Sequence, residues 1–201
     1  EKMKKISKII IGTHNKGKFK ELSFLLSKKI KKISPENLGI KSPKENGKTF
    51  KQNSEIKAKY FFSKSKLYSI SDDSGLCINC LNGKPGIYSA RWAKKNGGFY
   101  KAMKKIISLI YIKNNKPRTT KAKFVCSLTF QLSQNKKITR QGVIYGNISN
   151  SIKGKNGFGY DSIFIPKNYK LTFGQMNKRK KMIIDHRYLA FKKLKKKINI
   201  L

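Results

Sequence analysis

Residues 71–75 read SDDSG and place two carboxylates side by side in a chain that has few of them. The sequence holds 48 Lys and Arg against 9 Asp and Glu, which gives a formal net charge of +39. Adjacent carboxylates repel each other, and a nearby cation or a shared proton relieves the repulsion. Asp72 and Asp73 therefore indicate metal or acid–base chemistry. The alternative is an ordinary Asp–Asp turn or helix cap.

A second candidate stretch, Gly12 to Lys18, reads GTHNKGK and lies between an apolar run and a helical pattern. It matches a P-loop up to its last position, where Phe19 replaces the hydroxyl residue that holds Mg²⁺. Free N–H groups at a helix start, with Lys16 and Lys18, still favour a bound phosphate. The missing hydroxyl argues against a P-loop ATPase, and an ordinary surface turn remains an alternative. Mg²⁺ would then need other oxygens, which Asp72 and Asp73 offer.

Two later segments carry groups suited to a nucleobase. In GFGYD, residues 157–161, Phe158 offers a flat ring on which a base can stack. In DHR, residues 185–187, Arg187 offers donors for a carbonyl and a ring nitrogen of a base. The alternatives are an ordinary core aromatic at Phe158 and a satisfied structural histidine at His186.

Hydrophobic spacing predicts which elements hold these groups. KIIIG indicates a short buried strand, followed by a helix with Phe19, Leu22 and Leu26 on one face. A second helix is predicted over residues 53–62. LYSISDDSGLCINCL indicates a strand, a turn at the two acids and another extended stretch.

The second half of the chain continues the mixture of helices and strands. A helix is predicted with Phe99, Met103, Ile106 and Ile110 on one face, followed by a half-buried alternating strand over residues 122–132. RQGVIYGNI is predicted to be its sheet neighbour, and an apolar strand is predicted to end at Pro166. A helix follows from residue 186. The pattern indicates an α/β protein, residues 1–201 forming one domain with a mixed sheet flanked by helices.

Composition and charge limit the class of protein. No apolar run is long enough to span a bilayer or to form a signal-peptide core, and three cysteines suit a reducing compartment, so we expect a cytoplasmic protein. The lysines are spread along the whole chain. This spread favours a solvated coat over a dedicated nucleic-acid site, with weak, salt-sensitive, non-specific binding expected.

Seven segments in order, THNKGK, ENGKTFKQN, SDDSGL, GKPGIYSARWA, AKFVCSLTF, NGFGYDSIFIP and DHR, resemble one family over nearly the whole chain. This family is the inosine triphosphate pyrophosphatases, also called dITP/XTP pyrophosphatases. The resemblance implies Mg²⁺-dependent hydrolysis of dITP, ITP and XTP to a nucleoside monophosphate and pyrophosphate, which removes these nucleotides from the pool. It also implies an elongated α/β fold with a long central mixed sheet, two helical lobes, a cleft between the lobes, and a homodimer.

The resemblance also implies roles for particular residues. Asp73 would bind metal together with Glu45 and accept a proton from the attacking water, and Ser74 would contact substrate. The triphosphate would be held by Thr13, His14, Asn15, Lys16, Gly17 and Lys18. The base pocket would be formed by Phe158, Gly159, Tyr160 and Asp161 and closed by Lys181, His186 and Arg187.

Departures from the family pattern concern base selectivity. His14, Asp185 and Tyr188 stand where the family usually has other residues, at positions expected near the base. An alternative is therefore a relative that acts on modified or pyrimidine nucleotides. A basic nucleic-acid-binding protein that has lost activity is an alternative from a different class.

Overall fold

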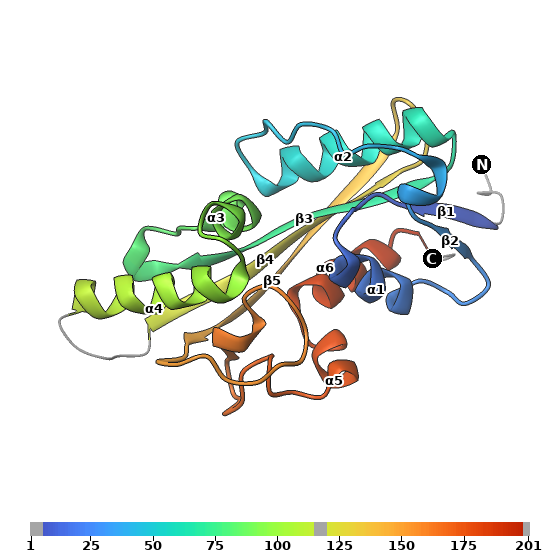
Figure 1. The fold of residues 1–201 in the computed structure, drawn as a ribbon. Helices are drawn as coiled ribbons and strands as arrows, with labels where there is room; N and C mark the ends of the chain where they lie inside the picture. The colour runs from blue at the N-terminus through green and yellow to red at the C-terminus, as the bar shows by residue number, and fades with distance from the viewer. Residues whose placement is uncertain (1–5, 115–119, 199–201) are drawn as a thin grey trace. The chain divides into compact units, whose positions relative to one another are not determined.

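The apolar runs and helical stripes of the sequence form an α/β fold around a mixed sheet, as a computed structural model of residues 6–114 and 120–198 shows (Figure 1). The sheet order is β2-β1-β3-β4-β5-β6, with β1 parallel to β2 and β3, and β5 antiparallel to β6. The predicted fold class is confirmed. The strands are β1 Lys8–Ile11, β2 Lys31–Ile33, β3 Ser69–Ile78, β4 Thr120–Gln131, β5 Lys137–Ile148 and β6 Phe164–Pro166.

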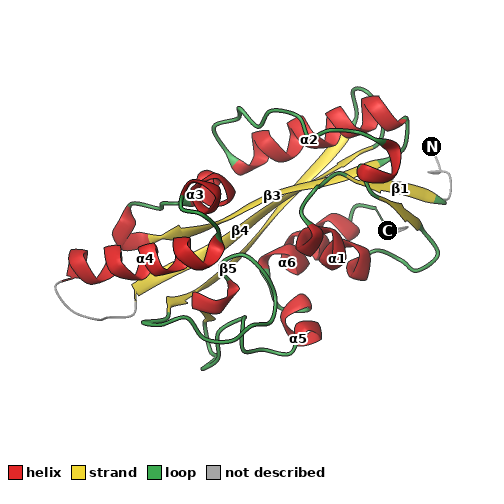
Figure 2. Cartoon of the chain, viewed as in Figure 1, coloured by secondary structure: helices red, strands yellow, loops and turns green. Residues whose placement is uncertain are grey.

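Figure 2 shows the helices around the sheet in red. The predicted helices correspond to α1, α2, α4 and α6, whereas α3 and α5 were not predicted. None of the helices, within the described part of the chain, has both the length and the apolar character needed to cross a membrane. Their bounds are α1 Lys16–Leu25, α2 Phe50–Ser65, α3 Ser89–Lys95, α4 Phe99–Asn114, α5 Lys178–Met182 and α6 His186–Lys195.

The chain divides into two compact units. Unit 1 comprises Glu1–Asp73, Cys126–Gly142 and Arg187–Leu201, and unit 2 comprises Ser74–Val125 and Val143–His186. Each unit has its own hydrophobic cluster. The organisation of residues 1–201 as a single domain stays a prediction.

In unit 1 the sheet is covered on both faces. Helices α1 and α6 pack on one face, with Leu22 and Leu194 in the same cluster as Ile70 and Leu128 (Figure 1). Helix α2 lies on the other face, where the Ser54 hydroxyl is 3.0 Å from that of Ser127 and 2.9 Å from that of Thr129. The prediction of a half-buried strand is therefore wrong for this part of β4. Its hydroxyl residues look solvent-facing in the pattern, but hydrogen bonds to Ser54 allow their burial.

In unit 2 the apolar stripe of α4 packs on one face of the sheet. The cluster contains Met103 and Ile106 of α4 together with Ile78 of β3, Phe124 of β4 and Phe164 of β6. The predicted helix and the strand that ends at Pro166 are both confirmed.

Strand β3 runs without a break through the acidic pair. We predicted a turn at Asp72 and Asp73, but Ser69–Ile78 forms one ten-residue strand in which both acids are buried. Aspartate and glycine are rare in strands because they pack poorly there. Here neighbouring cations, described below, stabilise the carboxylates, so tertiary contacts outweigh the local preference.

A close approach of the backbone at Gly12 fixes the loop that follows β1. The Gly12 N–H donates to the Ile70 carbonyl (2.8 Å), and the Ser71 hydroxyl donates to the Gly12 carbonyl (3.1 Å). A Cβ at position 12 would overlap the Ser71 hydroxyl and the Phe61 ring. We therefore expect Gly12→Ala to lower the free energy of unfolding by about 1–3 kcal/mol, measured by denaturant titration. An unchanged midpoint would contradict this tight approach.

Candidate active site

Asp72 is the centre of a buried ion-pair network in unit 1. Nε and Nη2 of Arg187, at the start of α6, donate to Oδ2 of Asp72 at 3.2 and 3.1 Å. Nη1 of Arg187 contacts the Glu21 carboxylate on α1, and Lys18 Nζ lies 3.6 Å from Oδ1 of Asp72. Burial by itself raises the pKa of Asp72, but the charges of Lys18, Arg187 and Lys57 hold it well below its ordinary value. The protein's own cations therefore relieve the repulsion expected at this position.

Asp73 has a different environment, because successive strand residues point to opposite faces of a sheet. Asn53 of α2 faces this carboxyl, and its amide acts to lower the pKa of Asp73, while its Oδ1 accepts the Gly47 N–H at 2.8 Å. Oδ2 of Asp73 is buried and makes no hydrogen bond. Burial raises the pKa of Asp73, and Glu45 adds to the rise, against the opposing charges of Lys57 and Lys18. Asp73 is thus the acid of the pair that takes up a proton more readily.

Lys57 brings a buried positive charge to the same place. Its Nζ lies 2.6 Å from Oε1 of Glu45. Burial lowers the pKa of Lys57, but the charges of Asp72, Glu45 and Asp73 outweigh burial and raise the pKa above the ordinary value. Lys57 is therefore charged, and with Lys18 it forms a cationic environment around the two aspartates.

The donor set near Asp73 fits Mg²⁺. The described residues contain no group of three or more His, Cys, Asp or Glu side chains arranged to hold a metal ion. Mg²⁺, however, usually takes only one or two protein carboxylates and completes its shell with phosphate oxygens and water. A buried carboxylate oxygen without a hydrogen bond, such as Oδ2 of Asp73, is an atom that such an ion would satisfy.

The loop after β1 has the features of an anion site. Asn15 caps α1, its Oδ1 accepting the Lys18 N–H at 2.9 Å, and the Thr13 hydroxyl accepts the Asn15 N–H at 3.1 Å. Lys16 is exposed, while Thr13 is buried. His14 is also exposed, and its Nδ1 lies 3.1 Å from Oε1 of Glu36. Capped helix starts with nearby lysines bind phosphate well.

Unit 2 contains a second cluster of predicted site residues. Lys181 Nζ lies 2.9 Å from Oδ2 of Asp161 and 3.6 Å from Oδ2 of Asp185. The same ammonium group is 4.7 Å from the centroid of the half-exposed Phe158 ring. Asp161 also accepts the Phe158 N–H at 3.0 Å, which fixes the turn. The arrangement orients an aromatic face beside a cation.

The other predicted residues of unit 2 differ in burial and in their contacts. The Tyr160 hydroxyl donates to the Ser89 carbonyl at 2.6 Å, and burial raises the pKa of Tyr160. The His186 ring stacks on Phe124 with centroids 4.6 Å apart. Gly159 adopts a positive φ of 62°, and Ser74 is half-buried on β3.

The structure brings the predicted residues together within each unit. Unit 1 holds the loop from Thr13 to Lys18 with Glu45 and Asp73, and unit 2 holds Ser74, residues 158–161, Lys181 and His186. Arg187 was predicted to contact a base. Its hydrogen bonds to Asp72 and Glu21 place its guanidinium in the unit 1 network, and the base contact stays a prediction.

Sequence reasoning missed three residues of the unit 1 cluster: Glu21, Asn53 and Lys57. Acidic residues are rare in this chain. This rarity singled out Asp72, and it could have singled out Glu21 in the same way. Asn53 and Lys57 lie four residues apart on α2, and that spacing places them on one helix face. A polar amide and a lysine on the buried face of a helix are a signal that the sequence already contained.

Comparison with known proteins identifies the family. The family model of the Ham1 family matches residues 9–197. The chain belongs to the Ham1 family. A dITP/XTP pyrophosphatase from Haemophilus influenzae is 40% identical over 195 residues, covering 95% of this chain and 98% of the relative. One from Zymomonas mobilis is 36% identical over 188 residues, covering 93% of this chain and 90% of the relative.

A solved structure agrees with this assignment. A Ham1 protein from Coxiella burnetii superposes with a TM-score of 0.85 at 30% identity, covering 98% of this chain and all of that one. The resemblance inferred from the seven motifs is therefore confirmed, and so is the prediction of a pyrophosphatase enzyme at the level of the family.

Proposed function

We propose that this Ham1 family member hydrolyses dITP, ITP and XTP to the nucleoside monophosphate and pyrophosphate with the help of Mg²⁺. Its similarity to dITP/XTP pyrophosphatases supports the reaction class. Removal of such nucleotides from the pool supports a cytoplasmic location, and the family resemblance supports a homodimer.

One observation carries the proposal: the unsatisfied, buried Oδ2 of Asp73 lies on a strand beside the cations Lys18 and Lys57. A nucleoside triphosphate carries several negative charges, and fixed cations stabilise the charge that develops during phosphoryl transfer. A carboxylate with a raised pKa is suited to receive a proton near neutral pH. Asp73 has both nearby cations and a raised pKa.

The proposed reaction assigns a task to each group. A water oxygen forms a bond to the α-phosphorus, the bond from this phosphorus to the α–β bridging oxygen breaks, and pyrophosphate leaves. The proton of the water passes to Asp73. The loop from Thr13 to Lys18 binds the phosphates through backbone N–H groups and lysines. Asn53, on the face of α2 beside Asp73, is proposed to orient this carboxylate.

Asp73 and Glu45 are proposed to hold Mg²⁺, which when bound supplies positive charge that neutralises the phosphates. Lys57, 2.6 Å from Glu45, holds this carboxylate in place. Asp72 has a different role, because Arg187 and Lys18 already neutralise it.

The base is proposed to stack on Phe158, whose turn is fixed by Asp161, Gly159 and the buried Tyr160. Lys181 lies beside this turn, and His186 stacks on Phe124 in unit 2. Hypoxanthine and xanthine present a 6-oxo acceptor, whereas adenine presents a 6-amino donor. A pocket built of donors leaves them unpaired with adenine, and buried unpaired donors are costly.

Release of pyrophosphate from a panel of nucleotides tests the function. We expect dITP, ITP and XTP to be turned over with Mg²⁺, and ATP, which lacks the 6-oxo acceptor, to be a poor substrate. Loss of one buried hydrogen bond costs about 1–3 kcal/mol, so selectivity against ATP of roughly 5- to 150-fold is expected. GTP and dTTP, which both carry an oxo group, complete the panel. Orthophosphate as the product would contradict the cleavage site, and preferred turnover of dTTP would favour a pyrimidine-directed relative. Full activity in excess chelator would rule out the Mg²⁺ site.

A further inference from the structure

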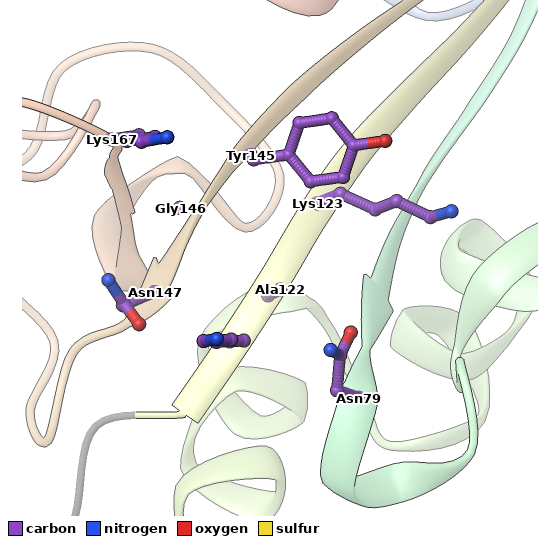
Figure 3. A pocket seen from close by; sticks show the side chains of 8 residues that line it. Asn79, Ala122, Lys123, Tyr145, Gly146, Asn147 and Lys167 are labelled. Atoms are coloured by element: carbon purple, nitrogen blue, oxygen red, sulfur yellow. The ribbon is translucent and has the colours of Figure 1, made fainter.

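A groove on the exposed sheet face of unit 2 is unexplained by the proposed function. Its volume is about 510 Å³, within the range of ligand sites. We call it the lysine–tyrosine groove and define it by Asn79, Lys121, Lys123, Tyr145, Asn147 and Lys167 (Figure 3).

Strand alternation produces this surface. On β4, Ala122 is buried while Lys121 is exposed and Lys123 half-exposed, and on β5, Gly146 is buried while Tyr145 and Asn147 are exposed. The buried residues face the α4 side, where Ala122 belongs to the unit 2 core. The side chains of Lys121, Lys123, Tyr145 and Asn147 therefore lie on the opposite, exposed face of the sheet.

The groove is suited to an anion. It is lined by three lysines, and none of the described residues that line it is an aspartate or a glutamate. A second copy of this chain is a poorer occupant than nucleic acid, because its 9 Asp and Glu offer few carboxylates to pair with the three lysines of the groove. Nucleic acid is the common polyanion that also offers apolar rings.

Tyr145 supplies the platform for such a ring. Tyr145 is 61% exposed, so its ring is accessible from solvent. Strand β5 lies between β4 and β6 in the sheet, so Lys121 and Lys123 stand on one side of Tyr145. Lys167 stands on the other side and donates its N–H to the Tyr145 carbonyl at 2.8 Å. The ring is thus flanked by cations on both sides.

Cations on both sides of the Tyr145 ring favour a nucleic-acid strand over a mononucleotide as the ligand. A base within a strand has a phosphate on both its 5′ and its 3′ side, whereas a free nucleoside 5′-phosphate has phosphate on one side only. Stacking of an unpaired base on Tyr145 also requires a single strand, because duplex bases are already stacked. The amides of Asn79 and Asn147 can donate to or accept from any base edge.

We propose that the lysine–tyrosine groove binds single-stranded nucleic acid without sequence specificity. Base stacking on Tyr145 and phosphate contacts of Lys121, Lys123 and Lys167 are the interactions responsible. The binding is local, which separates it from the diffuse attraction expected of a lysine coat. It requires no substrate turnover and stands independently of the proposed pyrophosphatase activity.

The test is fluorescence anisotropy of the full chain with labelled oligo(dT) of about ten nucleotides, within the usual site size. Loss of one base stack in Tyr145→Ala is expected to weaken binding by about 5- to 150-fold. The matched control is Tyr111→Ala, which removes a tyrosine of similar exposure (53%) from α4 and is expected to change binding less than twofold, roughly the error of such titrations.

Salt dependence tests the lysines. In Lys121→Gln/Lys123→Gln the slope of log K against log salt is expected to fall by about 1.4, or about 0.7 per lost phosphate contact with a single strand. The control Lys28→Gln/Lys29→Gln removes the same charge from two exposed positions of unit 1 and should leave the slope unchanged. Circular dichroism and the melting temperature check that every variant is folded.

Three results would overturn the proposal. Equal losses in the groove variants and the controls would show diffuse attraction to the lysine coat. Binding of dTMP as tight as that of the oligonucleotide would show a mononucleotide site. A groove variant that becomes monomeric in sedimentation, while its oligonucleotide binding is unchanged, would show that a second copy of the chain occupies this face.

Discussion

Replacing Asp73 by asparagine is expected to lower kcat for dITP hydrolysis by about 10²–10⁴-fold, the usual contribution of a positioned proton acceptor. Asparagine keeps the shape of the side chain but cannot accept the proton of the attacking water. The measurement is pyrophosphate release at saturating dITP and Mg²⁺.

Stability separates this effect from unfolding. Asp73 is a buried carboxylate whose Oδ2 makes no hydrogen bond and whose pKa is raised by burial, so its charge is costly in the folded state. We therefore expect Asp73→Asn to melt at the wild-type temperature or above it. Glu55→Gln is the control, since Glu55 is a half-buried acid on α2 that pairs with Lys137. Retained turnover in Asp73→Asn would exclude this residue as the proton acceptor.

In contrast to Asp73→Asn, Asp72→Asn is expected to destabilise the fold, by about 3–5 kcal/mol. The change leaves the buried guanidinium of Arg187 and the ammonium of Lys18 without their shared carboxylate. For a chain of this length such a loss lowers Tm by roughly 6–20 °C, measured by differential scanning calorimetry.

A double variant shows whether Asp72 and Arg187 depend on each other. Arg187→Met in the Asp72→Asn background removes both charges of this pair, but it also removes the partner of the buried Glu21 carboxylate. The effects of the two single variants are therefore expected not to add, with a coupling energy of about 0.5–3 kcal/mol. Simple additivity of the two single variants would mean that Arg187 does not depend on Asp72. If both predictions hold, Asp72 stabilises the fold and Asp73 takes part in the reaction.

Local patterns predicted most elements correctly for a physical reason. The apolar residues of α4 recur with the period of a helix, so a helix places all of them on one buried face. The short apolar run before Gly12 fits a strand that is buried on both faces. The motifs that carry the family resemblance are also local, although SDDSGL and AKFVCSLTF lie within the long strands β3 and β4 and not in loops.

Patterns failed where distant residues compensate an unfavourable local choice. SDDSG looks like a turn, yet Arg187, 115 residues further along the chain, stabilises it as a strand. The hydroxyls of β4 look exposed, yet Ser54 pairs with them in the core. Local spacing cannot predict either partner, because Arg187 and Ser54 lie far from Asp72 and Ser127 in the sequence.

The sequence by itself determined the family, the longer helices and strands, and the groups able to handle a polyphosphate, since these depend on residue types and short spacings. It did not predict β2, α3 or α5. Only the tertiary structure decided which aspartate is neutralised by protein cations and which keeps a buried, unsatisfied oxygen. That division follows from strand alternation, which turns two neighbouring carboxylates toward opposite faces of one sheet, and from what each face provides: a guanidinium for Asp72, an amide for Asp73.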